Sequence, residues 1–158
     1  MKRMLYALTF SLLLNIFLGF TLFEQWKQNA TITDQAFNNF YHHLNATGIY
    51  LDKYLDEKEP SLLARAQNSA DAAMIEANII SNHFDKNNSL STYMNDFMGK
   101  IMTIDANDFN DEQISNYLLD INSLKETILS SDKKIIQKDK GTLNEFLEKA
   151  SNIVQIND

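Results

Sequence analysis

The sequence of 158 residues has no cysteine, one proline, four glycines and a single valine, Val154. Without cysteine the chain cannot form a disulfide, a cysteine-ligated zinc site or a thiol nucleophile. β-Sheets need turn residues and favour β-branched side chains, so the composition argues against a β-sandwich or a β-barrel.

Positive charge is also scarce. Lysine and arginine together number 14 against 21 aspartate and glutamate residues, which gives a formal net charge of -7, and Arg3 and Arg65 are the only arginines. Binding to a phosphate backbone depends on clustered basic side chains, so no nucleic-acid partner is expected. The preference for lysine over arginine, with abundant asparagine and isoleucine, resembles proteins of low-GC bacteria.

Residues 4–23 form an uncharged stretch that is mostly leucine, phenylalanine and other apolar types. A helix of 20 residues is roughly 30 Å long, which matches the hydrocarbon core of a bilayer. Lys2 and Arg3 precede the stretch, whereas residues 24–158 contain 12 basic and 21 acidic residues. The positive-inside rule therefore predicts a cytosolic tail at 1–3, a transmembrane signal-anchor helix at 4–23 and an extracytoplasmic part at 24–158.

The alternative for this stretch is a secretory signal that is removed after export. Such signals have an apolar core of 7–15 residues and a cleavage site with small side chains. The apolar core here is longer, and Gly19-Phe20-Thr21 is followed by the bulky Leu22 and Phe23 rather than forming an A-x-A pattern. We therefore expect an uncleaved, single-pass anchor in the cell membrane.

Within the predicted membrane helix, Ala7, Ser11, Asn15 and Gly19 recur every four residues. This spacing places them on one face, which we call the partner face. Small residues allow two membrane helices to approach closely, and an asparagine can hydrogen-bond to a neighbouring helix. The partner face is therefore predicted to contact another membrane helix; the alternative is that the span tolerates Asn15 without a partner.

The rest of the chain shows apolar residues at helical spacing in five segments. Seven-residue spacing indicates amphipathic helices that bury one side. The rows are Phe37, Leu44 and Leu51; Leu63, Ala70, Ala77 and Phe84 beside Ala66, Ala73 and Ile80; Leu90, Phe97 and Ile104; Ile114, Ile121 and Ile128; and Leu143, Phe146, Ala150 and Ile153.

These segments predict an all-α fold, in which the membrane helix is followed by an antiparallel bundle of four to five helices with coiled-coil-like seams. The register predicts that the N-terminal helix continues into the bundle, with residues 31–33 as the place for a break. Pro60 predicts a helix end at residues 57–59. Thr142 and Glu145 form a capping box that predicts the start of the last helix.

No arrangement of residues indicates catalysis. His42 and His43 are adjacent, so they point in different directions on a helix and cannot chelate one ion as an i,i+4 pair would. The acidic loop at residues 105–111 lacks the glycine and the last glutamate of a calcium-binding EF-hand loop. We therefore predict no catalytic residue, no cofactor and no metal ligand, and we do not expect an enzyme.

The sequence is best interpreted as an extracytoplasmic helical bundle that acts by protein–protein interaction. Its expected partners are the membrane and another envelope protein or a second copy of itself, contacted through the membrane helix and the bundle, and its expected role is that of an accessory or regulatory subunit. The alternative is a ligand-sensing bundle that works through a separate subunit. A filled core would favour the first function, and an apolar pocket with convergent polar groups would favour the second.

Overall fold

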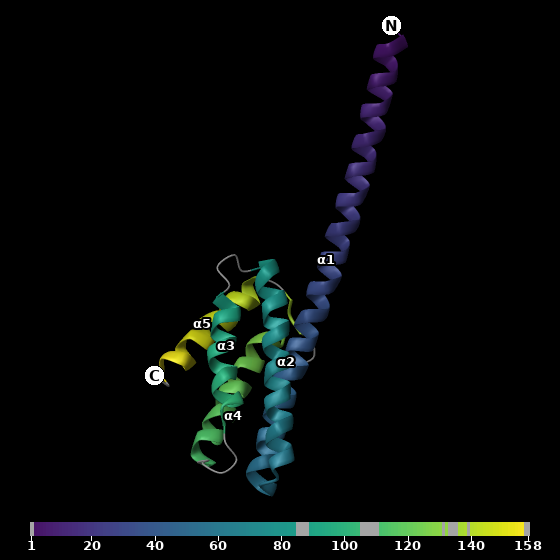
Figure 1. The fold of residues 1–158 in the computed structure, drawn as a ribbon. Coiled ribbons are helices and arrows are strands. Elements are labelled where there is room, and N and C mark those ends of the chain that lie inside the picture. The colour runs from purple at the N-terminus through teal and green to yellow at the C-terminus, as the bar shows by residue number, and fades with distance from the viewer. Residues whose placement is uncertain are drawn as a thin grey trace. The chain divides into compact units, whose positions relative to one another are not determined.

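The computed structural model describes residues 2–84, 89–104, 111–130, 132, 136–138 and 140–156. In this part of the chain the protein is helical, and it has no strand beyond one isolated bridge between Leu129 and Ile136. The helices are α1 (Lys2–Glu57), α2 (Pro60–Phe84), α3 (Ser89–Met102), α4 (Asp111–Ile128) and α5 (Lys140–Ile156). The prediction of an all-helical fold is confirmed (Figure 1).

The chain forms two compact units, Met1–Asp34 and Gln35–Asp158, and α1 contributes residues to both. No helix in the described ranges is long and apolar enough to cross a membrane, so the predicted membrane span at residues 4–23 gains no support from the structure. The side chains of Met4, Leu5, Ala7 and Leu8 lie outside the described residues.

Helix α1 continues through residues 31–33, so the predicted break is wrong. The Thr31 hydroxyl donates a hydrogen bond to the Lys27 carbonyl oxygen at 3.0 Å, and the Thr33 hydroxyl donates to the Asn29 carbonyl oxygen at 2.8 Å. Threonine hydroxyls often bond the carbonyl one turn earlier in this way, and this bond satisfies the side chain without ending the helix.

The end of α1 agrees with the prediction made from Pro60. The helix ends at Glu57, and Lys58 adopts a left-handed conformation with φ of 55°. The Lys58 N–H donates to the Tyr54 carbonyl oxygen at 2.9 Å, which satisfies one of the last carbonyls of the helix. Pro60 then opens α2, where its fixed φ suits the first helical position.

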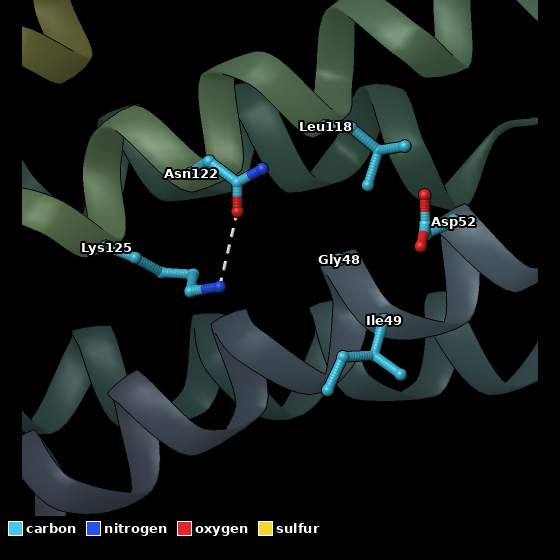
Figure 2. Close-up of a pocket in the computed structure, with 6 residues that line it drawn as sticks. All are labelled: Gly48, Ile49, Asp52, Leu118, Asn122 and Lys125. Carbon is cyan, nitrogen blue, oxygen red and sulfur yellow. Dashed lines mark hydrogen bonds between the residues drawn. The ribbon is translucent and has the colours of Figure 1, made fainter.

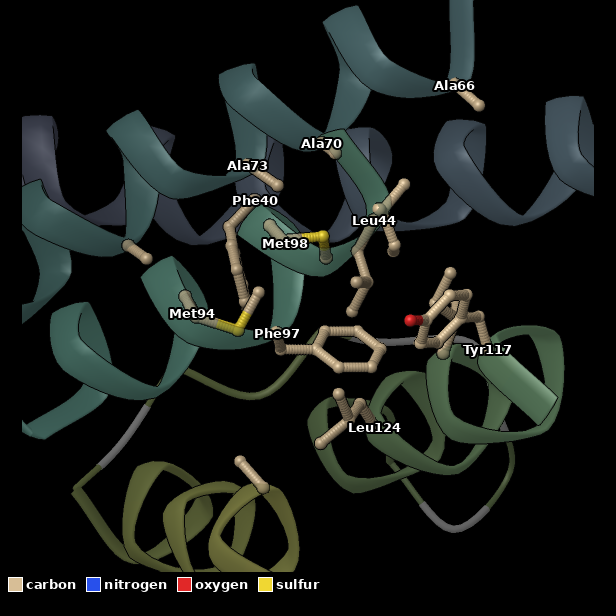
Figure 3. Packing of buried hydrophobic residues seen from close by; sticks show 14 of the residues in the cluster. Phe40, Leu44, Ala66, Ala70, Ala73, Met94, Phe97, Met98, Tyr117 and Leu124 are labelled. Carbon is tan, nitrogen blue, oxygen red and sulfur yellow. The ribbon is translucent and has the colours of Figure 1, made fainter. Parts of the chain in front are cut away.

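Residues 35–158 pack around one apolar core (Figure 3). Within this unit α2, α3 and α4 run in alternating directions along the chain (Figure 1). Aromatic rings connect the helices: Phe40 of α1 meets Phe146 of α5 edge-on at 5.4 Å between ring centroids. Phe97 of α3 meets Tyr117 of α4 in the same way at 6.2 Å.

The alanine row of α2 is buried as the heptad spacing predicts. Ala66, Ala70, Ala73 and Ala77 are each 0% exposed. Figure 3 shows the first three on the face of α2 that is directed toward the apolar core. Because an alanine side chain is a single methyl group, the row lets the neighbouring helices lie close to α2.

A glutamine of α2 donates hydrogen bonds to carbonyl oxygens at the C-terminal end of α3. The Gln67 amide nitrogen donates to the carbonyl oxygens of Met102 at 3.1 Å and Ile104 at 2.9 Å. The last carbonyls of a helix have no partner inside the helix, so these bonds fix both the end of α3 and its position along α2.

The predicted start of α5, with Thr142 as the cap, is wrong. The helix begins at Lys140, which places Thr142 in its first turn instead of at the cap. Thr142 is 5% exposed, and its hydroxyl donates to the Gln137 side-chain oxygen at 3.0 Å. The capping box therefore does not define this helix start.

Candidate functional site

Three residues of the partner face, Ser11, Asn15 and Gly19, are exposed on α1. The fourth, Ala7, has its side chain outside the described residues. A Cβ atom added at Gly19 would have no atom within 4 Å other than those of its chain neighbours and of the adjacent helix backbone. The surface over Gly19 is therefore open to an approaching molecule.

Large apolar side chains are exposed all along this part of α1. Leu12, Leu13, Phe17 and other members of the stretch are 47–71% exposed. The set consists of Tyr6, Phe10, Leu12, Leu13, Leu14, Ile16, Phe17, Leu18, Phe20, Leu22, Phe23 and Trp26. Monomeric soluble proteins rarely expose a contiguous apolar surface of this kind, so the stretch is a candidate contact surface.

The histidines and acidic residues form no metal-binding cluster among the described residues. His42 and His83 are exposed, and His43 is half-buried. No group of three histidine, aspartate or glutamate side chains in the described ranges is placed to hold a metal ion. Residues 105–110 of the acidic loop lie outside the described residues.

Two of the three methionines spaced along α3 belong to the core. Met94 and Met98 are each 0% exposed, whereas Met102 is 40% exposed. Methionine fills irregular space in helical cores, and Met94 and Met98 have this role in α3. A continuous methionine binding surface is therefore absent from α3.

The structure also contains a pocket between α1 and α4 that the sequence did not predict (Figure 2). We call it the α1–α4 pocket. Its volume is about 190 Å³, and it is lined by Gly48, Ile49, Asp52, Leu118, Asn122 and Lys125.

Gly48 sets the distance between the two helices below this pocket. It is buried, and a Cβ atom at this position would lie 3.2 Å from Ile121 Cγ2 and 3.9 Å from Leu118 Cδ2. The shorter distance is tighter than an ordinary van der Waals contact, so the Ile121 side chain would have to shift by a few tenths of an ångström to admit a methyl group at this position. The glycine therefore allows a close approach that brings Lys125 and Asn122 to the edge of α1.

The Lys125 side chain is half-buried between the two helices. Burial lowers the pKa of the Lys125 ammonium from its ordinary value, and the neighbouring Glu126 carboxylate partly offsets this effect. The ammonium donates a hydrogen bond to the Asn122 side-chain oxygen at 3.3 Å. In the described part of the chain it has no carboxylate within ion-pair distance.

A second hollow adjoins the first and shares Asn122 and Lys125 with it. Its volume is about 360 Å³, and its other lining residues are Tyr41, Glu126 and Leu129. Lys125 therefore lies between two recesses along the same pair of helices. Its polar head can reach groups bound in either recess.

Sequence reasoning missed this site because its residues show no distinctive spacing. Asp52 and Lys125 are far apart in the chain and line one pocket only because α1 packs against α4. The one local signal is Gly48, since a glycine inside a helix is unfavourable by about 1 kcal/mol relative to alanine and is kept where the backbone needs a close contact.

Comparisons with protein-family models, with curated proteins and with solved structures found no match to this chain.

Proposed function

We propose that residues 4–23 anchor this protein in the cell membrane, with the N-terminus in the cytosol and residues 24–158 outside. There it acts by binding another protein of the cell envelope, as an accessory or regulatory subunit. The observation that carries the proposal is the exposure of large apolar side chains on every side of the N-terminal part of α1.

The exposure is not confined to one face. Leu12, Leu13, Leu14, Ile16, Phe17 and Leu18 are 47–63% exposed, and these six apolar residues of residues 12–18 point in different directions around the helix axis. A groove on a protein covers one face of a helix, whereas lipid surrounds it. A helix that is apolar all round is therefore better matched to a bilayer than to a single docking groove.

Charge supports the proposed orientation. Lys2 and Arg3 precede the apolar stretch, and the next charged residue is Glu24. Residues 24–158 are strongly acidic, and cytosolic flanks of membrane helices are enriched in lysine and arginine. Phe23 and Trp26, whose ring centroids are 6.2 Å apart, stand where aromatic residues collect at a membrane surface.

The packing of residues 35–158 favours protein–protein interaction over catalysis. The buried cluster takes apolar side chains from each helix, for example Phe40, Ala73, Met98, Ile121 and Phe146. A bundle with a filled interior recognises other molecules through its surface, and the surface of this one is acidic and helical.

The first prediction concerns topology. In intact protoplasts, an added protease is expected to digest a tag at the C-terminus of the full chain, because residues 24–158 lie on the outer side of the cell membrane under this proposal. The measurement is loss of the tag on an immunoblot, with a cytosolic protein as the control for intact cells. Protection of the tag, or a mature N-terminus located after Phe23, would contradict the proposed anchor.

The second prediction concerns the partner face. Gly19→Leu is expected to block close approach of a second helix, and Asn15→Leu is expected to remove one polar contact. Interhelical polar contacts average about 0.6 kcal/mol, so Asn15→Leu should weaken association only about threefold, and Gly19→Leu should weaken it more. Both changes make the span more apolar, so insertion should be unaffected.

Crosslinking measures this effect directly, because the chain has no native cysteine and Ser11→Cys introduces a single reactive site on the partner face. Thr21→Leu is the control, since it also makes the span more apolar but changes a residue on the side of the helix away from Gly19. Equal crosslinking yields for Gly19→Leu, Thr21→Leu and the parent would show that the span is only an anchor.

A further inference from the structure

The α1–α4 pocket places opposite charges on two sides of an apolar floor. Figure 2 shows Lys125 and Asn122 of α4 directed into the pocket from one end and Asp52 of α1 at the other end. Gly48 and Leu118 lie between them. This arrangement offers a hydrogen-bonding cation, an apolar surface and a carboxylate to one bound molecule.

The Lys125 ammonium has lost part of its hydration without gaining an ion pair in the described part of the chain. Its described hydrogen bond goes to Asn122 and is long, at 3.3 Å. Burial lowers its pKa, which means that the folded protein disfavours the charged form. A carboxylate brought into the pocket would supply the charge-assisted hydrogen bond that this ammonium lacks.

The surrounding charges decide which kind of molecule fits. Asp52 lines the pocket, Glu126 lines the adjoining hollow, and the chain has a net charge of -7, so a simple anion is disfavoured. A metal cation is disfavoured by the Lys125 ammonium. A molecule that carries both charges satisfies both ends.

We infer that the α1–α4 pocket binds a small aliphatic zwitterion, with its carboxylate at Lys125 and Asn122 and its ammonium group at Asp52. The methylene chain between the two charges lies over Gly48 and Leu118. A cavity of about 150 Å³ holds benzene, so the 190 Å³ here accommodates a molecule of this size. The pocket lies entirely within residues 35–158, so this inference does not depend on the membrane anchor.

The test uses the purified full chain in detergent micelles and isothermal titration calorimetry with 5-aminopentanoate. A ligand this small in an open pocket is expected to have a dissociation constant on the order of 1 mM. Pentanoate lacks the ammonium group and pentylamine lacks the carboxylate, so each should bind about tenfold more weakly. Titration into empty micelles corrects for partition into detergent.

Variants identify the site. Lys125→Met retains the length of the side chain and is expected to weaken binding of 5-aminopentanoate about tenfold, and Asp52→Asn is expected to weaken it severalfold. Lys53→Met is the matched control, because Lys53 is exposed on α1 and does not line the pocket. Since burial disfavours the Lys125 ammonium, Lys125→Met should not lower the melting temperature, so lost binding would not reflect unfolding.

Three results would overturn the inference. One is a titration that shows no saturable heat at 5-aminopentanoate concentrations on the order of ten times the expected dissociation constant. Another is equal affinity for 5-aminopentanoate and pentanoate, which would show that Asp52 does not contribute. The third is an unchanged affinity in Lys125→Met, which would place the binding elsewhere on the protein.

Discussion

Phe40→Ala is expected to lower the free energy of unfolding of the bundle by about 3–5 kcal/mol. Phe40 is 2% exposed, and its ring packs edge-on against Phe146 at 5.4 Å between centroids. The substitution removes a large buried apolar surface, leaves a cavity and ends the aromatic contact between α1 and α5. Domains of this size have a total stability of about 5–15 kcal/mol, so the loss is a substantial part of the whole.

The measurement is chemical denaturation of residues 24–158 followed by circular dichroism at 222 nm. This fragment includes about four helical turns of α1 ahead of Phe40, so the first buried residues are not at a frayed end. Leu119→Ala is the control, because Leu119 is 68% exposed and its truncation should change stability by no more than about 0.5 kcal/mol. A loss below 1 kcal/mol for Phe40→Ala would mean that α1 does not pack on α5 as described.

The core could largely be predicted, because apolar residues at helical spacing lie on the face of each helix that is buried. The row of Leu63, Ala70 and Ala77 and the row of Ala66 and Ala73 were chosen only by their spacing, and each of these residues is at most 3% exposed. A helix of a bundle must bury one face, so the apolar period and the buried face coincide. Phe84 belongs to the same pattern, but its side chain lies outside the described residues.

Helix boundaries were less predictable because local motifs compete with packing. Thr142 and Glu145 have the spacing of a capping box, yet α5 begins at Lys140 and Thr142 is buried. The three β-branched residues at 31–33 weaken a helix only slightly, and the hydroxyls of Thr31 and Thr33 are satisfied by carbonyls of the preceding turn. A weak local preference therefore does not interrupt α1.

The partner face could be predicted from the sequence, whereas the α1–α4 pocket could not. The partner face follows from a spacing of four on one helix, so Ser11, Asn15 and Gly19 could be chosen before any fold was known. The α1–α4 pocket depends on the packing of two helices that are distant in the chain. Neither Asp52 nor Lys125 differs in its sequence surroundings from an ordinary surface residue of an acidic helical protein.

Ala73→Leu is expected to destabilise the bundle by about 1–3 kcal/mol. Ala73 is 0% exposed at the centre of the alanine row of α2, and Figure 3 shows it on the face directed toward Phe40 and Met98. Three additional carbon atoms at this position must displace neighbours that already fill the interior. Native interiors are packed about as densely as organic crystals, so the displacement moves helices apart instead of filling empty space.

Thermal and chemical denaturation of residues 24–158 measure this effect, and Ala64→Leu is the matched control. Ala64 is an exposed alanine of the same helix, so leucine there adds the same atoms and has a similar helix propensity without entering the core. A lower midpoint for Ala73→Leu, with an unchanged midpoint for Ala64→Leu, would attribute the loss to overpacking. Equal midpoints for the two variants would place Ala73 at a surface, and the close packing of helices along the alanine row would then be wrong.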